Sequence, residues 1–213
     1  MDLPRPILCL VTDASVLGAR PLVEAVDKAV AGGVNLVQLR DRSLPARELL
    51  ALACELRIVT QGRALLFVND RIDVALASEA DGVQLPEAGL PVAEARRIAG
   101  DRLLIGRSVH SLQTAIEAAE QGADLVQVGT VFPSQTHPEL EASGVGLVTV
   151  LASCVSAPVV GIGGITGGNA REVIEGGASG VAVVRAILAS EEPEAASATL
   201  KRVIEAEWRK RNE

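Results

Sequence analysis

A short phrase of sequence recurs along this chain, and it constrains the fold more than any other feature. Gly-Gly-Val-Asn-Leu-Val-Gln-Leu occupies residues 32–39, Gly-Ala-Asp-Leu-Val-Gln-Val residues 122–128, and Gly-Ala-Ser-Gly-Val-Ala-Val residues 177–183. In each copy a glycine ends a helical pattern, a short turn follows, and an apolar strand begins. A chain that repeats this order alternates helices with buried strands.

Eight such units can be read along the sequence. Eight strand–helix units in 213 residues predict a single (β/α)8 TIM barrel spanning residues 1–213, near the lower size limit of that fold. A doubly wound open sheet is the alternative, but it normally has fewer units. The expected strands lie at 7–11, 35–39, 64–68, 82–85, 103–105 and 125–128, with the last two ending at Gly161 and Val184.

The composition suits a barrel and argues against several classes of partner. Apolar residues make up 48 % of the chain, but there are only two Phe, one Trp and no Tyr, so the core is aliphatic. A net charge of −7 and the lack of aromatic residues argue against nucleic-acid binding. No apolar run approaches transmembrane length, so we expect no membrane partner either.

The cysteines and the N-terminal segment favour a cytoplasmic location. Cys9, Cys54 and Cys154 are odd in number and far apart, which predicts buried free thiols in a reducing compartment. A strand-like segment begins within a few residues of Met1, so we expect no signal peptide.

Glycines and helix starts follow the last two strands and predict a phosphate site. Glycine lets the backbone approach a ligand closely, and the start of a helix offers unpaired N–H groups. Two such junctions side by side would form a phosphate-binding cup from Gly163, Gly164, Val184 and Arg185. The alternative is that these glycines only turn a corner.

Two arginines follow the second strand, where the active site of a barrel is expected. Gln38, Arg40 and Arg42 alternate along an extended segment, so all three can face one ligand. Two inward guanidiniums would suit a phosphate or a carboxylate. The alternative is that the arginines pair with Asp41 or Glu48 on the rim.

Further polar residues follow the third, fifth and sixth strands. Asn69 and Asp70 stand where a helix should start, so either could cap that helix, and Asp70 could equally bind Mg²⁺. His110 comes just after the fifth strand, with Ser111 placed to cap the next helix, and His137 lies in the long sixth loop. A lone histidine is usually structural, but a histidine at a barrel mouth is a candidate catalytic base.

These segments resemble the thiamine phosphate synthase/TenI superfamily of small barrels. The resemblance covers nearly the whole chain and is specific for the superfamily, and it implies a role in thiamine biosynthesis with a thiazole phosphate as ligand. It is carried by residues 10–13 (Leu-Val-Thr-Asp), 37–40, 68–75, 129–133, 161–165 and 181–187.

The synthases of this superfamily join a pyrimidine diphosphate to a thiazole phosphate and release pyrophosphate, with Mg²⁺ on the leaving group. By resemblance, Asp70 would be a metal ligand, and Gln38, Arg40 and Asn69 would bind the pyrimidine diphosphate. Gly89 stands where the synthases carry a second metal carboxylate.

Other departures point to the TenI branch. The sixth loop lacks the lysine of the synthases, and the segments at 83–86 and 106–112 look more like TenI proteins. These catalyse an aromatising tautomerisation of a thiazole carboxylate phosphate, which requires a base and no metal. The familiar TenI base follows the sixth strand, where this chain has Thr130, so His110 or His137 would have to replace it.

A thiazole tautomerase without a cofactor is therefore the favoured hypothesis. The alternative is a divergent synthase that uses Asp70 and Glu87 as an irregular Mg²⁺ pair, and a third hypothesis is a non-catalytic, thiazole-phosphate-binding or regulatory protein. Small barrels of this superfamily often pair, so a homodimer is also an expectation. Substrate contacts are expected from Gln38, Arg40, Arg42, Asn69, Ser108, Ser134 and Thr136.

Overall fold

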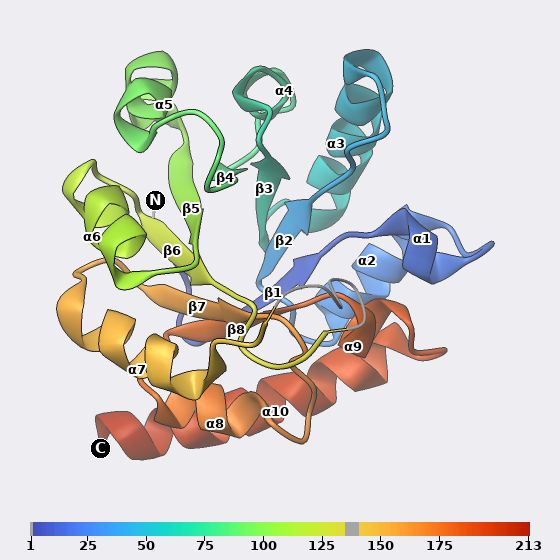
Figure 1. The fold of residues 1–213 in the computed structure, drawn as a ribbon. Coiled ribbons are helices and arrows are strands. Elements are labelled where there is room, and N and C mark those ends of the chain that lie inside the picture. Colours follow the sequence, from blue (N-terminus) through green and yellow to red (C-terminus); the bar gives the residue numbers. More distant parts are fainter. Residues whose placement is uncertain (1, 135–140) are drawn as a thin grey trace.

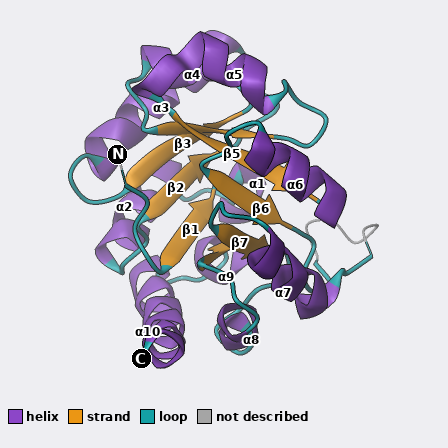
Figure 2. Cartoon of the chain, turned by 90° about the vertical axis from the view of Figure 1, so that its left-hand side faces the viewer, coloured by secondary structure: helices purple, strands orange, loops and turns teal. Residues whose placement is uncertain are grey.

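The chain folds as a closed parallel barrel surrounded by helices (Figures 1 and 2). The computed structural model describes residues 2–134 and 141–213. Each strand pairs in parallel with the next, and the last pairs with the first, so the predicted (β/α)8 barrel is confirmed. The strands are β1 (Ile7–Val11), β2 (Leu36–Leu39), β3 (Leu65–Asn69), β4 (Gly82–Leu85), β5 (Leu104–Val109), β6 (Leu125–Val128), β7 (Val159–Ile162) and β8 (Gly180–Val183).

The helices lie outside the strands, and the long C-terminal helix packs against α2, α8 and α9 (Figure 1). They are α1 (Ala14–Leu17), α2 (Leu22–Ala31), α3 (Ala46–Thr60), α4 (Ile72–Ala77), α5 (Val92–Ala99), the 3-10 turn η1 (Gly100–Arg102), α6 (Leu112–Glu120), α7 (Gly144–Cys154), α8 (Ala170–Glu175), α9 (Arg185–Leu188) and α10 (Pro193–Asn212).

The core has two layers, as expected for strands that are covered on both faces. One layer lies between the strands and the helices, and it is almost wholly aliphatic. The other fills the barrel itself and includes Phe67, which is fully buried. Gly82 on β4 makes room for that ring, because a Cβ there would lie 2.5 Å from the Phe67 ring.

Strand β5 is longer than the expected segment at 103–105. Gly106 and Arg107 pair in parallel with both β4 and β6, and Ser108 and Val109 continue the pairing with β6. Ser108 therefore lies inside the strand, and His110 follows its end directly. The sequence pattern missed this extension because Gly106, Arg107 and Ser108 interrupt the apolar run.

Only one of the three cysteines matches the prediction of buried thiols. Cys9 is buried inside the barrel, and this burial raises the pKa of its thiol. Cys54 and Cys154 are exposed on helices, so the prediction was wrong for these two. Among the helices of the described residues, none has the length and apolar character to span a bilayer.

Candidate active site

A cavity of about 640 Å³ opens at the carboxyl ends of the strands. It collects most of the residues that the sequence predicted for the site. Thr136 and His137 lie outside the described residues, so the predictions for them stay predictions. The predicted residues that line the cavity are Gln38, Arg40, Arg42, Asn69, Ser108, His110, Thr130, Ser134, Gly163, Gly164, Val184 and Arg185.

The end of β2 presents two arginines to this cavity. The hydroxyl of Thr12 accepts a hydrogen bond from Arg40 N at 2.8 Å and donates one to Arg40 O at 3.2 Å, so the Arg40 backbone is held in place. Asp41 instead accepts hydrogen bonds from the Ser43 backbone and hydroxyl. Within the described residues neither arginine forms an ion pair, so the predicted alternative of rim pairing is not supported.

The guanidinium of Arg42 affects the pKa of Arg40. Burial lowers the pKa of Arg40, and the like charge of the nearby Arg42 lowers it further. Asp13 and Asp41 act in the opposite direction from nearby, but neither forms an ion pair with these arginines. Two neighbouring cations that form no ion pair within the described residues are suited to binding an anion. The structure thus brings together the arginines that the sequence singled out.

The end of β3 adds an amide pair and a carboxylate. Gln38 Nε2 donates to Asn69 Oδ1 at 3.2 Å, which fixes the orientation of both side chains. Asp70 is exposed, has a φ of 64°, and donates its N–H to Gln84 O at 2.9 Å. The prediction that Asn69 or Asp70 caps the next helix is wrong, because Arg71 occupies the N-cap position and no side chain caps α4.

Position 89 faces the Asp70 carboxylate. A Cβ on Gly89 would lie 3.2 Å from Asp70 Oδ1, so a carboxylate at position 89 would stand beside Asp70. With glycine there, one carboxylate is left, and Mg²⁺ commonly takes one or two carboxylates while phosphate oxygens and water complete its coordination. The single carboxylate of Asp70 is of the kind that Mg²⁺ binds, but Asp70 is not among the residues that line the cavity, so its role as a metal ligand stays a prediction. Within the described part of the chain no three His, Cys, Asp or Glu side chains gather as a metal site.

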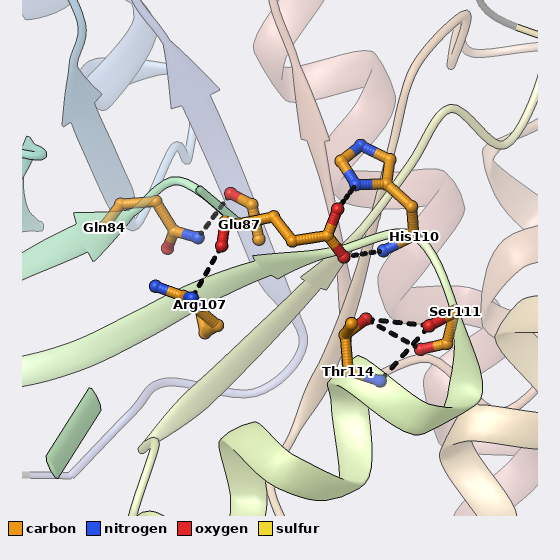
Figure 3. Close-up of polar contacts among 7 residues, drawn as sticks. Gln84, Glu87, Arg107, His110, Ser111 and Thr114 are labelled. Atoms are coloured by element: carbon orange, nitrogen blue, oxygen red, sulfur yellow. Dashed lines mark hydrogen bonds and ion pairs between the residues drawn. The ribbon is translucent and has the colours of Figure 1, made fainter. Parts of the chain in front are cut away.

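Glu87 is paired with His110 at the mouth of the barrel (Figure 3). His110 Nδ1 lies 2.7 Å from Glu87 Oε2, and the His110 backbone N–H donates to Glu87 Oε1 at 3.0 Å. The irregular metal pair of Asp70 with Glu87 that the sequence left open is therefore not supported. Ser111 caps α6 as predicted, since its hydroxyl accepts from Thr114 N.

The contact with His110 contributes to a lowered pKa of Glu87. Partial burial acts to raise the pKa of Glu87, but hydrogen bonds from His110 and Thr114 outweigh it and hold that pKa below its ordinary value. Arg107 Nη2 donates to the Glu87 carbonyl at 2.7 Å and so fixes the loop that carries the carboxylate. Because an ionised carboxylate only accepts hydrogen bonds, Nδ1 of His110 is the donor in this contact.

The glycines after β7 pack against the loop that follows β6. Gly163 and Gly164 have φ values of 103° and 61°, which favour glycine. A Cβ on Gly163 would lie 2.8 Å from Thr130 Cγ2, and one on Gly164 would lie 2.8 Å from Phe132 Cβ. These glycines thus form a turn and leave room for the neighbouring loop to pack closely against it. They also line the cavity.

The start of α9 lies at the same cavity as the glycine turn. Val184 precedes the helix and Arg185 is its first residue. The first N–H groups of a helix have no acceptor within it. The predicted phosphate site from Gly163, Gly164, Val184 and Arg185 therefore stays a prediction whose members lie at one cavity.

Gln127, which lines this cavity, escaped the sequence-based set of candidate site residues. Gln84 on β4 and Gln127 on β6 are both almost fully buried, as is Gln38 on β2. A signal was present, because all three strands contain Val-Gln followed by an aliphatic residue. A polar residue at the same place in three apolar strands indicates a polar layer inside the barrel.

Comparisons with known proteins show the family of this chain. A family model described as thiamine monophosphate synthase matches residues 8–187. The thiamine-phosphate synthase of Haloarcula marismortui is 44 % identical over 201 residues, which cover 92 % of this chain and 95 % of that protein. The thiamine-phosphate synthase of Pyrococcus horikoshii is 42 % identical over 199 residues, covering 93 % of this chain and 94 % of that protein.

Solved structures give the same picture. A thiamine phosphate pyrophosphorylase from Pyrococcus furiosus superposes with a TM-score of 0.87 at 39 % identity, covering 94 % of this chain and 96 % of that one. A 3-hexulose-6-phosphate synthase superposes with a TM-score of 0.72 at 18 % identity, covering 93 % of this chain and 99 % of that one. At that identity the second likeness concerns the fold alone.

Proposed function

The chain belongs to the thiamine monophosphate synthase family, and from that premise we propose that it is a thiamine-phosphate synthase. In this reaction a hydroxymethylpyrimidine diphosphate is joined to a thiazole phosphate, and pyrophosphate is released. The relatives are named thiamine-phosphate synthases, which was the alternative hypothesis of the sequence analysis. They give no support to the tautomerase branch that the sequence pattern favoured.

The observation that carries the proposal is that two separate groups of residues suited to binding an anion line one cavity. Arg40 and Arg42 lie at the end of β2, and the turn at Gly163 and Gly164 with the start of α9 lies after β7 and β8. Both substrates of the synthase carry phosphate groups, so each region has one anionic group to bind. A cavity of about 640 Å³ lies within the range of small-molecule sites.

The reaction requires charge stabilisation and no proton transfer. The C–O bond between the pyrimidine methylene and the diphosphate breaks, and the thiazole ring nitrogen supplies the electron pair of the new C–N bond. Negative charge develops on the leaving diphosphate, where the guanidiniums of Arg40 and Arg42 stabilise it. Mg²⁺ held by Asp70 would add positive charge at the same diphosphate.

A direct assay tests this proposal. Purified protein is incubated with both substrates and Mg²⁺, and thiamine phosphate and pyrophosphate are measured. We expect the two products in equal amounts, with activity reduced at least tenfold in Arg40→Ala. Arg47→Ala, an exposed arginine on α3, is the matched control and should keep full activity. Absence of thiamine phosphate with the wild-type protein would contradict the proposal.

The Glu87–His110 pair favours a second candidate function, proton transfer on a thiazole carboxylate phosphate. Coupling of the two synthase substrates does not use a base, whereas tautomerisation does. Aromatisation of that substrate by the wild-type protein, lost in His110→Ala and reduced in Glu87→Gln, would establish it. Equal rates with and without protein would exclude it.

Two expectations about the cellular form of the protein accompany this proposal. A homodimer and a cytoplasmic location stay predictions. Light scattering of the purified chain measures its mass in solution and checks the first. A mass near that of one chain, 22.1 kDa, would contradict the homodimer.

A further inference from the structure

Three glutamines point into the barrel from alternate strands, and one of them differs from the other two. Gln38, Gln84 and Gln127 lie on β2, β4 and β6 and are 3 %, 1 % and 5 % exposed. Gln38 Nε2 donates to Asn69 Oδ1, and Gln84 Nε2 donates to Ser108 Oγ at 3.1 Å. These two amides are held within the protein.

Gln127 has no such partner. Within the described residues no hydrogen bond of its side chain occurs. Every fully buried side-chain nitrogen or oxygen of that part of the chain has a partner, so the Gln127 amide must be reached from the cavity that it lines. A nearly buried amide without a partner is costly, by about 1–3 kcal/mol, unless water or a ligand satisfies it.

The surroundings of Gln127 restrict what can satisfy it. The neighbouring inward residues Leu125 and Val160 are apolar and buried. The hydroxyl of Ser108, which pairs in register with Gln127, already accepts from Gln84. A donor or acceptor for the Gln127 amide therefore comes from the contents of the cavity.

The distance from the glycine turn indicates which part of a ligand reaches this amide. Gln127 is in register with Val160 on β7, and Gly163 lies three residues further along the chain. At about 3.3 Å per residue, the turn stands roughly 10 Å above Gln127. A phosphate held at the turn thus places the far edge of a small ring, joined by a short linker, beside the amide.

We propose that Gln127 is a specificity-determining residue that hydrogen-bonds the polar edge of a heteroaromatic ring whose phosphate is held at the Gly163–Gly164 turn. The chemical class of ligand is a phosphate monoester of a small heteroaromatic ring with a donor or acceptor at the end remote from the phosphate. The identification of that ligand as a thiazole phosphate rests on the proposed function, whereas the hydrogen bond itself does not. In a synthase the amide would donate to the ring nitrogen while the pyrimidine diphosphate is absent, and this hydrogen bond would break before the nitrogen forms the new C–N bond.

Calorimetric titration of the full chain tests this with two probes, thiazole ethyl phosphate and inorganic phosphate. In Gln127→Leu the affinity for thiazole ethyl phosphate should fall about tenfold, the loss of one hydrogen bond, while the affinity for inorganic phosphate is unchanged. Gln113→Leu, which removes an exposed amide on α6, is the matched control and should bind both probes like the wild type. Unchanged affinity of Gln127→Leu for thiazole ethyl phosphate, or an equal loss for both probes, would overturn the proposal.

A second variant keeps the test decisive if Gln127→Leu is poorly folded. Gln127→Glu has nearly the same shape but lacks the amide N–H donors. Its affinity for a thiazole ethyl phosphate that bears a ring carboxylate should fall strongly, and its affinity for thiazole ethyl phosphate without the carboxylate should fall less. Wild-type affinity of Gln127→Glu for both would overturn the proposal.

The binding test is independent of turnover. Neither probe experiment contains the pyrimidine diphosphate, so failure of thiamine phosphate synthesis would contradict the proposed function and leave these affinities unaffected. Conversely, a synthase whose Gln127 variants bind normally would retain the proposed function and lose this inference.

Discussion

Position 89 decides how many carboxylates this site can offer to a metal ion. Gly89 faces the Asp70 carboxylate, and no φ in the left-handed region prevents a side chain there. The remaining space is tight, since a Cβ would lie 3.0 Å from the Pro86 ring. A single substitution at position 89 would therefore convert a site with one carboxylate into a site with two.

We expect Gly89→Asp to strengthen Mg²⁺ binding by at least tenfold, because a second carboxylate beside Asp70 adds charge and a ligand. Calorimetry with Mg²⁺ alone measures this, and the melting temperature should rise with Mg²⁺ more than in the wild type. Gly89→Asp combined with Asp70→Asn is the control and should lose the gain. Equal Mg²⁺ affinities of wild type and Gly89→Asp would show that the two positions do not share an ion.

Glu87 makes a pH-dependent contribution to stability at the same barrel mouth. Its pKa in the folded protein is held below the ordinary value of 4.5, so the native state binds its proton less readily than the unfolded state. The resulting stabilisation is fully present above about pH 4.5 and is lost as the pH falls through the folded pKa.

Glu87→Gln should therefore lose stability above pH 5 and show a smaller decrease between pH 5 and pH 3 than the wild type. Urea unfolding at each pH measures the free energy of unfolding. Glu55→Gln, an exposed residue on α3, is the control. A Glu87→Gln profile parallel to that of the wild type would mean that the contact with His110 contributes nothing to stability.

At the level of elements, the loops after β6 and β7 form one packed unit. Phe132 N donates to Gly163 O, and Val131 N donates to Ile162 O at 2.9 Å. The same segment is tied down further along, because Ser143 N donates to Thr130 O at 2.8 Å. The glycine turn can therefore keep its shape only while the loop after β6 stays against it.

Gly164→Ala tests this packing. Its φ of 61° and the approach of Phe132 both oppose a methyl group, whereas Gly62, with a φ of 73°, has open space around it. Gly62→Ala should cost about 1–2 kcal/mol for the backbone conformation alone. Gly164→Ala should cost about 1–3 kcal/mol more and weaken binding of inorganic phosphate. Equal unfolding free energies of the two variants would contradict the packing argument.

Elements also show where sequence patterns were less informative. The apolar runs placed the strands correctly, but the end of β5 and the start of α4 were missed. A polar residue that points into the barrel, such as Ser108, interrupts the apolar pattern and makes the end of a strand hard to recognise in the sequence. Before α4 the chain turns through the positive φ of Asp70, in place of the side-chain cap that the sequence suggested. Both features depend on neighbouring strands, because Ser108 pairs in register with Gln127 on β6 and Asp70 N donates to Gln84 O on β4.

On the scale of the whole molecule, closure of the barrel depends on the contact between β8 and β1. Gly180 is in register with Ile7, and a Cβ on Gly180 would lie 2.5 Å from Ile7 Cβ. We call the contact between β8 and β1 the seam of the barrel. Glycine at position 180 allows the two strands to approach each other closely there. A side chain there would press on the interior of the barrel.

Gly180→Ala should lower the free energy of unfolding by about 1–3 kcal/mol. Because a closed barrel unfolds as one unit, fluorescence of Trp208, the only tryptophan, and circular dichroism should report the same midpoint in urea. Gly146→Ala is the control, since that exposed position on α7 is open and alanine favours a helix. Different midpoints for the two signals would show that the seam opens independently.

The sequence by itself determined the barrel, its strand-end polar residues and its superfamily, because repeated glycine stops and aliphatic runs are local patterns. The tertiary structure alone showed that Glu87 pairs with His110, that Gly89 faces Asp70, and that the Gln127 amide has no partner among the described residues. Each of these depends on distances between different strands of the barrel. Such distances are set by closure and register, which no local pattern encodes.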